Sequence, residues 1–591
     1  MPRRTLLVIA VAAFAIRVYP FFLAGGIMAT PADYDTAVYF SASALLFRGV
    51  IPYRDFVFVH PPGALYLLGL TSFLDPAKAF AGARVLIALI GAVNAYLVGR
   101  AVGGRGGAIA AILYATYPDA VLGERGPLLE PVLNLVCLLG ANLWLKREKG
   151  GSWFGAAGAV KVLGGIWFLA ALASWPSSER VRKLTRLALR ALAVGLILVV
   201  PIAILAPRNY ITQTLSFHSW RPPDGMSRGE RIAAIFGGAN IVVTVLSAIA
   251  LLSMLRRPVS REKRFFAVAT ILTIVGFLTA KSYWPQYNAY LAASECALAG
   301  LGAELLLTKP AVAYVIVALQ LFFARGLVKT SRERTFDVLA VGRSVREIVP
   351  ANAALFSFDP LWSIAGGHLP RVVDTYGAAL LDLGPDKFGN VTDAFHSAPA
   401  QAALRRQLAA SEFVILGWRG NWHLTDETRA WFESHFECLA PAPGWLCVWG
   451  QTHGQATTFG EGWHDPESMP NGRVFRWMAA KGVTTLPHRG ARSHLVIDLY
   501  VPLDAIHATP TLTIEVDGRV IDRIVVKKPE VVRSYDVDTP NAAPHTVTIS
   551  TDHVVNPAKE HLSGDTRDLG LRLNSLTWTA AGGGDSTWSR R

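Results

Sequence analysis

Long apolar runs separated by short polar segments fill the first half of the chain and stop near residue 327. At 1.5 Å per residue, most of these runs are long enough to cross a hydrocarbon core. Residues 61–75 are also apolar but short, and we expect them to lie at the membrane surface. The pattern predicts about eleven spans, over residues 5–22, 79–102, 108–120, 128–144, 155–160 and 163–175 (a half-length pair), 187–205, 232–255, 265–280, 289–307 and 311–327.

The pattern changes twice after the last apolar run. Residues 331–450 alternate helical periodicity with short apolar strand patterns, which indicates a small α/β domain. Residues 451–580 contain short strands of alternating polarity, which predict an all-β, jelly-roll-like sandwich. Residues 581–591 are expected to be a disordered tail. The predicted membrane domain therefore covers residues 1–330.

Composition agrees with a membrane protein that carries a water-soluble tail. Hydrophobic residues make up 52% of the 591-residue chain, and charged residues only 17%. The formal net charge of +14 would suit a nucleic-acid partner. However, many of the Lys and Arg residues lie in short clusters between apolar runs, and no basic stripe with interleaved aromatic residues is present. We therefore expect a lipid bilayer and no nucleic acid as a partner.

The basic clusters also predict the orientation of the chain. Arg3 and Arg4 precede the first span, so the positive-inside rule places the N-terminus in the cytoplasm. A cleaved signal peptide is the alternative, but Arg17 interrupts the apolar run and further spans follow. The remaining clusters then fall on the same side as the N-terminus. The tail is expected outside, in the periplasm or extracellular space, and the chain in the cytoplasmic (inner) membrane.

Polar residues of a different kind alternate with the basic clusters and fall on the opposite, external side. The first group follows the first span and contains Asp33, Asp35, Arg54 and His60. Carboxylates at the rim of a bilayer are costly unless they face a cavity or a polar ligand. The later groups contain Arg125 with Glu130, Lys161, His218 with Arg221, and Lys281 with Gln286 and Tyr287.

Several of these residues could have a structural role instead of a functional one. Asp33 or Asp35 could cap the helix that follows them, although capping and catalysis can coexist. Arg54 could form a local ion pair with Asp55, and His60, held extended by the prolines after it, could be structural. Lys161 lies between two short apolar segments, so it needs an anionic partner, for which a lipid phosphate would serve.

Together, these motifs resemble the GT-C superfamily of membrane glycosyltransferases. The ordered set is an Asp-containing external loop with Tyr39 four residues after Asp35, then Pro-Tyr-Arg-Asp, His-Pro-Pro, a later Glu-Pro and a lysine between two short helices. Within the superfamily, the chain is most similar to the protein O-mannosyltransferase and aminoarabinose transferase branch. The region from Phe459 to Gly570 resembles carbohydrate-binding-like domains attached to envelope enzymes.

The resemblance implies transfer of a sugar from a polyprenyl-phosphate donor to a glycan, lipid or protein acceptor at the external face. It suggests Asp35 as the general base, with Asp33 orienting it, contacting the acceptor or sharing a divalent metal ion with it. Glu130 resembles the second acidic position of the family. Alternatively, it could be a structural carboxylate that is buried and has its hydrogen bonds made. The implied donor-phosphate ligands are Lys161, His218, Arg221 and Arg125, and the implied substrate contacts are Arg54, His60, Glu130, Lys281, Gln286 and Tyr287.

Two of these assignments carry alternatives of their own. Arg125 could be a snorkelling residue, and Arg221 could bind bulk lipid headgroups. Gln286 stands where relatives often have His, which puts an acid–base role at that position in doubt. No cofactor is indicated apart from the open question of a divalent metal ion at Asp33 and Asp35. Nothing in the spacing of Cys and His suggests a dedicated zinc site.

Two further function classes remain as alternatives. The chain could be a lipid or polysaccharide transporter, or flippase, although no internal repeat with paired interrupted spans is evident. It could also be a non-catalytic glycan-binding scaffold, which the presence of both loop aspartates disfavours. In the tail, Cys438 and Cys447 flank a turn-rich tip and could close a hairpin disulfide in an oxidising compartment.

Overall fold

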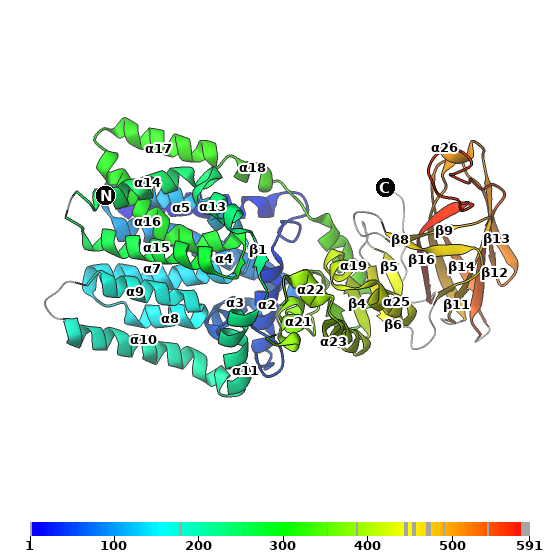
Figure 1. Ribbon diagram of the computed structural model, residues 1–591, viewed down its shortest axis with the longest axis horizontal. Helices are drawn as coiled ribbons and strands as arrows, with labels where there is room; N and C mark the ends of the chain where they lie inside the picture. Colours follow the sequence, from blue (N-terminus) through cyan, green and yellow to red (C-terminus); the bar gives the residue numbers. More distant parts are fainter. Residues whose placement is uncertain are drawn as a thin grey trace. The chain divides into compact units, whose positions relative to one another are not determined.

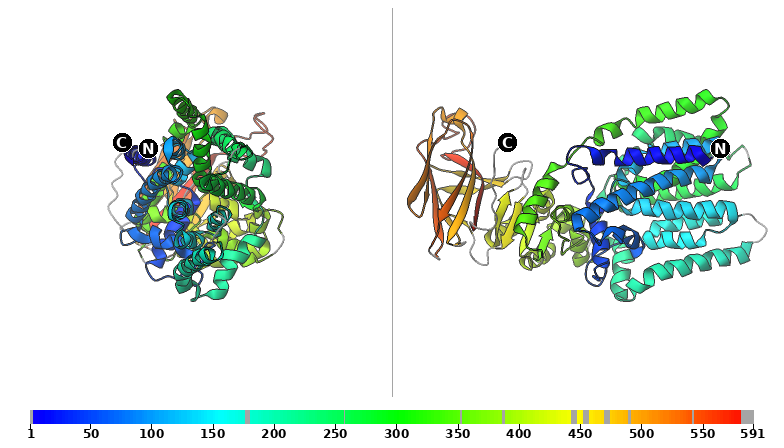
Figure 2. Two further views of the ribbon diagram at one scale, coloured as in Figure 1. Left: turned by 90° about the vertical axis from the view of Figure 1, so that its left-hand side faces the viewer. Right: turned by 180° about the vertical axis from the view of Figure 1, so that it is seen from behind.

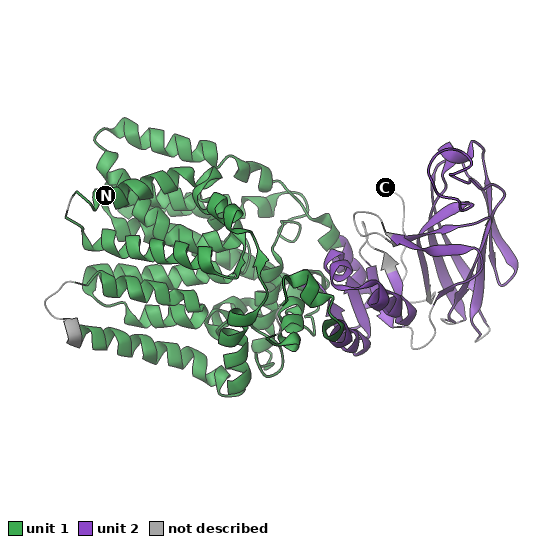
Figure 3. Ribbon diagram, in the orientation of Figure 1, with its two compact units in different colours: residues 1–339, 360–400 green, residues 340–359, 401–591 purple. Residues whose placement is uncertain are grey.

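The protein forms two compact units, which Figure 3 distinguishes by colour. The helical unit comprises residues 1–339 and 360–400, and the mixed unit comprises residues 340–359 and 401–591. The expected disordered tail, residues 581–591, lies outside the described residues. The computed structural model describes residues 3–175, 180–256, 258–351, 353–385, 388–441, 447–451, 457–468, 474–488, 491–540 and 543–580.

The helical unit is a bundle of long helices with shorter helices gathered at one end (Figures 1 and 2). Up to the end of the last apolar run it contains α1 (Arg3–Val18), α2 (Tyr34–Leu46), α3 (Leu65–Leu68), α4 (Pro76–Val102), α5 (Gly104–Ala115), α6 (Pro118–Gly123), α7 (Leu129–Arg147), α8 (Gly151–Val160), α9 (Gly165–Ala173), α10 (Arg180–Ala203), α11 (Pro207–Ile211), α12 (Phe217–Trp220), α13 (Arg228–Phe236), α14 (Ile241–Ser253), α15 (Arg261–Thr279), α16 (Asn288–Leu306) and α17 (Pro310–Phe323).

Six helical segments among the described residues are long and apolar enough to cross a membrane. The chain is therefore a multi-pass membrane protein, as predicted. The predicted total of about eleven spans stays a prediction, because only six segments of the described residues meet both requirements. The six segments are Arg3–Phe22, Pro76–Val102, Leu129–Arg147, Lys183–Ala203, Arg228–Ser253 and Pro285–Leu306.

Basic residues from four different helices meet at one end of the bundle. Glu148, directly after α7, lies 3.0 Å from Lys183 of α10 and 3.5 Å from Arg261 of α15. Lys146 of α7 donates to the carbonyl of Arg100 on α4, at 3.0 Å. The other end of α7 carries Glu130. The 19 residues of this helix span about 28 Å, which is close to the thickness of the hydrocarbon core.

A buried ion pair joins the first helices of the bundle. Arg17, which interrupts the first apolar run, is fully buried and donates from Nε to Oε2 of Glu124 at 2.6 Å. Tyr114 of α5 and Asn94 of α4 donate to the other carboxylate oxygen, at 2.6 and 3.2 Å. A charge at this depth needs a counter-charge. The pair therefore ties α1 to the turn after α6 (Pro118–Gly123).

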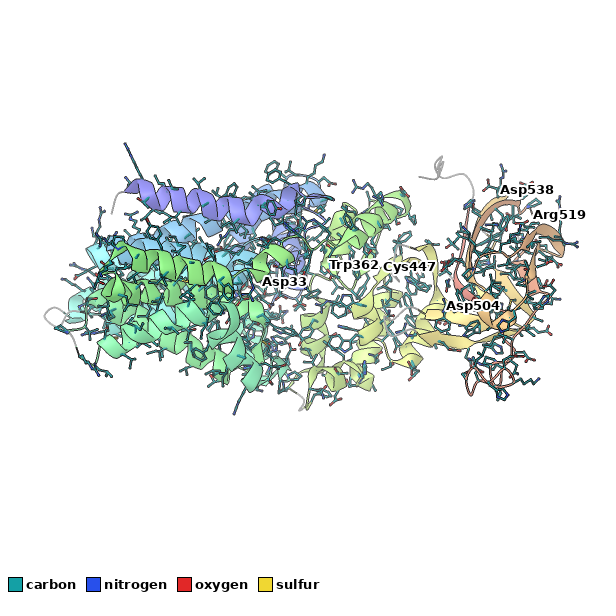
Figure 4. The ribbon with its side chains drawn as sticks, turned by 90° about the horizontal axis from the view of Figure 1, so that it is seen from above. Asp33, Trp362, Cys447, Asp504, Arg519 and Asp538 are labelled. Atoms are coloured by element: carbon teal, nitrogen blue, oxygen red, sulfur yellow. A yellow bond between two sulfur atoms is a disulfide. The ribbon has the colours of Figure 1, made fainter. Side chains whose placement is uncertain are left out.

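The chain continues through α18 (Gly326–Thr330) and α19 (Phe336–Ile348) and later returns to the helical unit. The returning residues, 360–400, contain α20 (Pro360–Ala365), α21 (Thr375–Leu383) and α22 (Val391–Phe395). Helix α20 packs on α2 and α4. Figure 4 labels Trp362 of α20 and Asp33 at the start of α2. This division differs from the predicted domain boundaries at residues 330 and 450, which remain predictions.

The mixed unit begins with a four-stranded sheet in the order β3-β4-β6-β5, in which only β3 and β4 are parallel. Helices alternate with strands along this part of the chain, and the α/β domain over residues 331–450 stays a prediction. Its elements are β3 (Leu355–Ser357), α23 (Ala398–Ala409, which begins in the helical unit), β4 (Phe413–Leu416), α24 (Trp418–His423), α25 (Asp426–His435), β5 (Phe436–Pro441) and β6 (Cys447–Gln451).

The rest of the mixed unit is a sandwich of two antiparallel five-stranded sheets, in the orders β13-β12-β15-β10-β7 and β14-β11-β16-β9-β8. Apolar residues from both sheets share one core. The β domain is confirmed, and the jelly-roll topology stays a prediction. The strands are β7 (Thr458–Phe459), β8 (Trp463–Ser468), β9 (Val474–Met478), β10 (Lys481–Leu486), β11 (Arg492–Tyr500), β12 (Thr511–Val516), β13 (Arg519–Val525), β14 (Glu530–Asp538), β15 (His545–Thr551) and β16 (Leu571–Ala580), with α26 (Leu503–Ile506) between β11 and β12.

Candidate active site

The candidate site is built around the start of α2, at the end of the bundle away from the basic cluster. Asp33 occupies the N-cap position, but its side chain makes no capping hydrogen bond to the helix, and it is exposed. Asp35 lies in the first turn and is partly exposed. Capping therefore does not account for Asp33, and Asp35 remains available to chemistry.

Arg84 of α4 holds the loop that leads to these aspartates. Its buried guanidinium donates to the carbonyls of Ile27, Thr30 and Pro31 at 3.0, 2.8 and 3.1 Å. It also donates to the carbonyl of Arg125 at 2.7 Å. One side chain thus fixes the loop before α2 against the turn before α7. An arginine inside an apolar run was the only sequence signal for this role.

Asp35 is surrounded by further carboxylates. Burial raises its pKa to about 7, and the negative charges of Asp374, Glu130 and Asp33 act in the same sense, whereas Lys161 opposes them. The amide of Gln286 donates to Asp35 Oδ2 at 3.3 Å. A carboxylate with a pKa near neutrality is suited to accept a proton.

Glu130 and Lys161 form an ion pair beside this carboxylate. Lys161 Nζ lies 2.7 Å from Glu130 Oε1, and both residues are buried. The ammonium also lies 4.5 Å from the centre of the Tyr287 ring, a cation–π contact. Lys161 lies in extended backbone between α8 and α9, the predicted half-length pair. The break between the two helices therefore places the lysine in the site. The anionic partner that the sequence required is Glu130.

Two histidines stack at the edge of this group. The rings of His60 and His218 lie 5.5 Å apart and nearly parallel. The hydroxyl of Tyr39 contacts His60 Nε2 at 3.2 Å, and His218 Nε2 contacts the carbonyl of Val59 at 2.8 Å. Burial lowers the pKa of His60, and the nearby charges of Lys161, His218 and Arg221 lower it further. His60 is therefore neutral at neutral pH.

Arg221, just after α12, places a second cation in the site. It donates to Asp224 at 2.8 Å and to the hydroxyl of Tyr376 at 3.2 Å. Its guanidinium lies over the rings of Phe217 and Tyr376. Its Nε is buried without a hydrogen-bond partner. An unpaired buried donor is costly, which makes Nε a candidate for contact with an anionic ligand.

A short parallel bridge brings two distant loops together here. Residues of β1 (Asp224–Gly225) pair with those of β2 (Ser282–Tyr283). Gly225 has a φ of +79°, and a Cβ at this position would lie 2.0 Å from the Tyr283 carbonyl oxygen, so only glycine fits. The bridge joins the loop of Arg221 to the loop that carries Gln286 and Tyr287.

Three predicted site residues have other surroundings. Arg54 makes a bidentate pair with its neighbour Asp55, both bonds being 2.8 Å, as the structural alternative proposed. Arg125 donates to the carbonyl of Ile16 and the hydroxyl of Ser331, at 3.2 and 2.7 Å, and so ties α1 to the end of α18. Lys281 is exposed. The contacts described here give these three residues no part in the group around Asp35.

The side chains around Asp35 do not form a set of metal ligands. Within the described ranges, no group of three or more His, Cys, Asp or Glu side chains converges as a bound metal ion requires. Lys161 compensates the charge of Glu130 directly. The divalent metal ion considered for Asp33 and Asp35 is thus not supported by the arrangement of these residues.

In the mixed unit, Cys438 and Cys447 form a disulfide that links β5 to β6, with their Cα atoms 5.8 Å apart. The turn between the two strands, residues 442–446, lies outside the described residues. Cys137 and Cys296 are free and buried within helices of the bundle.

Comparison with known proteins finds likeness in structure only. No family model and no curated protein matches the sequence. ArnT from Cupriavidus metallidurans, in the apo state, has a TM-score of 0.53 and 13% identity over 75% of this chain and 97% of ArnT. The same protein bound to undecaprenyl phosphate has a TM-score of 0.53 and 14% sequence identity, over 76% of this chain and 98% of ArnT. The Archaeoglobus fulgidus oligosaccharyltransferase, in complex with Zn and sulfate, has a TM-score of 0.50 and 10% sequence identity, over 98% of this chain and 97% of the oligosaccharyltransferase.

These solved structures are GT-C glycosyltransferases. This chain has the GT-C fold. At such low identity the likeness shows the fold alone, so the chemistry rests on the residues themselves. Within the GT-C fold, the site combines a basic carboxylate with two buried cations and a neutral histidine. Such a combination can accept a proton from one ligand while it neutralises charge on another.

We expect Arg84→Met to destabilise the protein, because four carbonyl groups lose their charged donor. Hydrogen bonds to charged groups contribute about 1.5–3 kcal/mol each, so the free energy of unfolding should fall by about 3 kcal/mol or more. Thermal unfolding of the purified protein in detergent measures the change. The matched control is Arg100→Met, on the same helix but with an exposed side chain. Equal unfolding midpoints for the two variants would contradict this role of Arg84.

Proposed function

We propose that the protein is a membrane glycosyltransferase that transfers a sugar from a polyprenyl-phosphate-linked donor to an acceptor of the cell envelope. The observation that carries the proposal is that Tyr287 lies among Lys161, Arg221 and Asp35, whose charges all act on its hydroxyl. The GT-C fold supports it, and the undecaprenyl phosphate bound to ArnT supports a polyprenyl phosphate as donor carrier. The acceptor is a hydroxyl of a glycan, lipid or protein.

In the proposed reaction, Asp35 removes the proton from the acceptor hydroxyl. The acceptor oxygen forms a bond to the anomeric carbon of the sugar while the bond from that carbon to the phosphate oxygen breaks. The electron pair of the broken bond leaves with the polyprenyl phosphate, whose charge Lys161 and Arg221 stabilise. Inversion at the anomeric carbon follows from the resemblance to the superfamily.

The two cations have different capacities for the phosphate. Lys161 donates one hydrogen bond to Glu130 and has two further N–H donors. Arg221 has the buried Nε that lacks a partner. His218 stacks on His60 next to this position. We assign phosphate binding to these residues. Arg125 is left out because its guanidinium binds Ile16 and Ser331.

We also propose that the site faces the outside of the cytoplasmic membrane. The basic cluster around Glu148 lies at the far end of α7, and the positive-inside rule assigns such a cluster to the cytoplasm. The disulfide between Cys438 and Cys447 agrees with an exported tail, since disulfides persist in oxidising compartments. A glycan held by the β-sandwich is part of the same proposal.

Asp35→Asn should lower the transfer rate by a factor of about 10²–10⁴, the usual contribution of a general base. In the native protein the rate should rise with pH through about 7, because Asp35 acts only when deprotonated and its pKa is raised to about 7. Asp33→Asn should lower the rate less than Asp35→Asn, because Asp33 is exposed. Purified protein in nanodiscs with a panel of polyprenyl-phosphate sugars provides the assay.

Full activity of Asp35→Asn, with an unchanged pH profile, would show that the base is another group. Failure of every polyprenyl-phosphate donor in the native protein would count against the reaction class and favour the transporter alternative.

Arg221→Met should weaken the binding of undecaprenyl phosphate by roughly 10- to 100-fold, the equivalent of one charge-assisted hydrogen bond. Undecaprenol, which lacks the phosphate, should bind to the native and variant proteins equally. Native mass spectrometry of protein–lipid complexes can measure both. The control is Arg208→Met, an exposed arginine of α11. The assignment is wrong if Arg221→Met and Arg208→Met retain the same affinity for the phosphate.

A further inference from the structure

Helix α21 approaches the site from a part of the chain that follows all the apolar helices. It belongs to residues 360–400, which return to the helical unit. Sequence patterns gave no reason to connect it with Asp35, because more than 330 residues separate the two. Its N-terminal residues Asp374, Thr375 and Tyr376 nevertheless contact both halves of the site.

The first contact is made with the start of α2. The hydroxyl of Tyr34 donates to Asp374 Oδ1 at 3.2 Å and accepts from the backbone N–H of Thr375 at 3.0 Å. Asp374 also caps α21 by accepting from the N–H of Gly377 at 2.9 Å. Tyr34 immediately precedes Asp35, so these bonds fix the first turn of α2 to the N-terminus of α21.

The second contact is made with the phosphate-binding side. The hydroxyl of Tyr376 donates to Asp224 and accepts from Arg221. The guanidinium of Arg221 lies 5.6 Å from the centre of the Tyr376 ring. Three consecutive residues of one segment thus touch the elements that carry the proposed base and the proposed phosphate ligand.

Asp374 is buried at the N-terminus of α21. Its charge acts on Asp35, as do those of Glu130 on α7 and Asp33 at the start of α2, while Lys161 at the end of α8 acts in the opposite sense. Gln286 donates a neutral hydrogen bond to Asp35. Among the carboxylates, Asp374 raises the proton affinity of Asp35 most.

We propose that Asp374 is a positioning residue for the transfer reaction, which fixes Asp35 through Tyr34 and adds a negative charge near it. This inference rests on the proposed function, because it assigns Asp374 to the base of that reaction. A more basic Asp35 removes a proton from a hydroxyl more readily. The segment after the last apolar helix is then a part of the active site.

The charge effect can be tested without any sugar donor. In protein carrying Asp35→Cys, the pH dependence of alkylation by iodoacetamide reports the pKa of the new thiol. Adding Asp374→Asn should lower that pKa by about one unit, because a neighbouring negative charge is removed. Asparagine can still accept from Gly377 and Tyr34, so the cap is retained. Cys137 and Cys296 are buried and should not react.

The control is Asp393→Asn in α22, an exposed aspartate of the same returning segment. It should leave the pKa of the thiol unchanged. The proposal is overturned if Asp374→Asn and Asp393→Asn give the same thiol pKa. If Asp374→Asn lowers the pKa of the thiol but the native protein transfers no sugar, only the proposed function is contradicted.

The positioning effect has a separate test. Tyr34→Phe removes the hydrogen bonds to Asp374 and Thr375 but no charge. It should lower the maximal transfer rate several-fold and leave the midpoint of the pH profile in place, whereas Asp374→Asn should move that midpoint to lower pH. An unchanged rate in Tyr34→Phe would refute the positioning role.

Discussion

A charged side chain within the thickness of a bilayer needs a counter-charge or a polar ligand, and this requirement governs the helical unit. Arg17 meets it with Glu124, and Lys161 meets it with Glu130. The first pair joins helices of the bundle. The second lies where α8 and α9 break, beside Asp35, and one buried pair thereby becomes part of a site. Around it, carboxylates and cations stand close enough to change each other's proton affinity.

The same constraint separates two kinds of charge along the bundle. The basic residues around Glu148 collect at one end of α7, and the acidic and histidine residues collect around Glu130 at the other. Clusters of the first kind determine topology, and groups of the second kind mark a candidate ligand site. Because a single helix connects the two ends, the distance between them is set by its length and matches a hydrocarbon core.

Much of this arrangement was predictable from the sequence. Apolar runs predicted most of the long helices, and alternating polarity predicted short strands within residues 451–580, of which β12 is one. The grouping of Asp35, Glu130, Lys161, Gln286 and Tyr287 followed from motif order. Other features depend on tertiary contacts that no local pattern encodes. Arg84 binds four carbonyl groups of two loops, and Asp374 reaches Tyr34, the neighbour of Asp35, only because residues 360–400 fold back. The resemblance implied Arg125 as a phosphate ligand, and its neighbours in the fold include Ile16 and Ser331.

The proposed function depends on a lipid phosphate that binds between Lys161 and Arg221, on the same side as Asp35. The most direct measurement is a structure of the native protein in nanodiscs with undecaprenyl phosphate added. We expect phosphate density within hydrogen-bond distance of Arg221 Nε and Lys161 Nζ, with Asp35 facing it across a space the size of a sugar. Phosphate density at the opposite end of α7, beside Lys146 and Lys183, would contradict it.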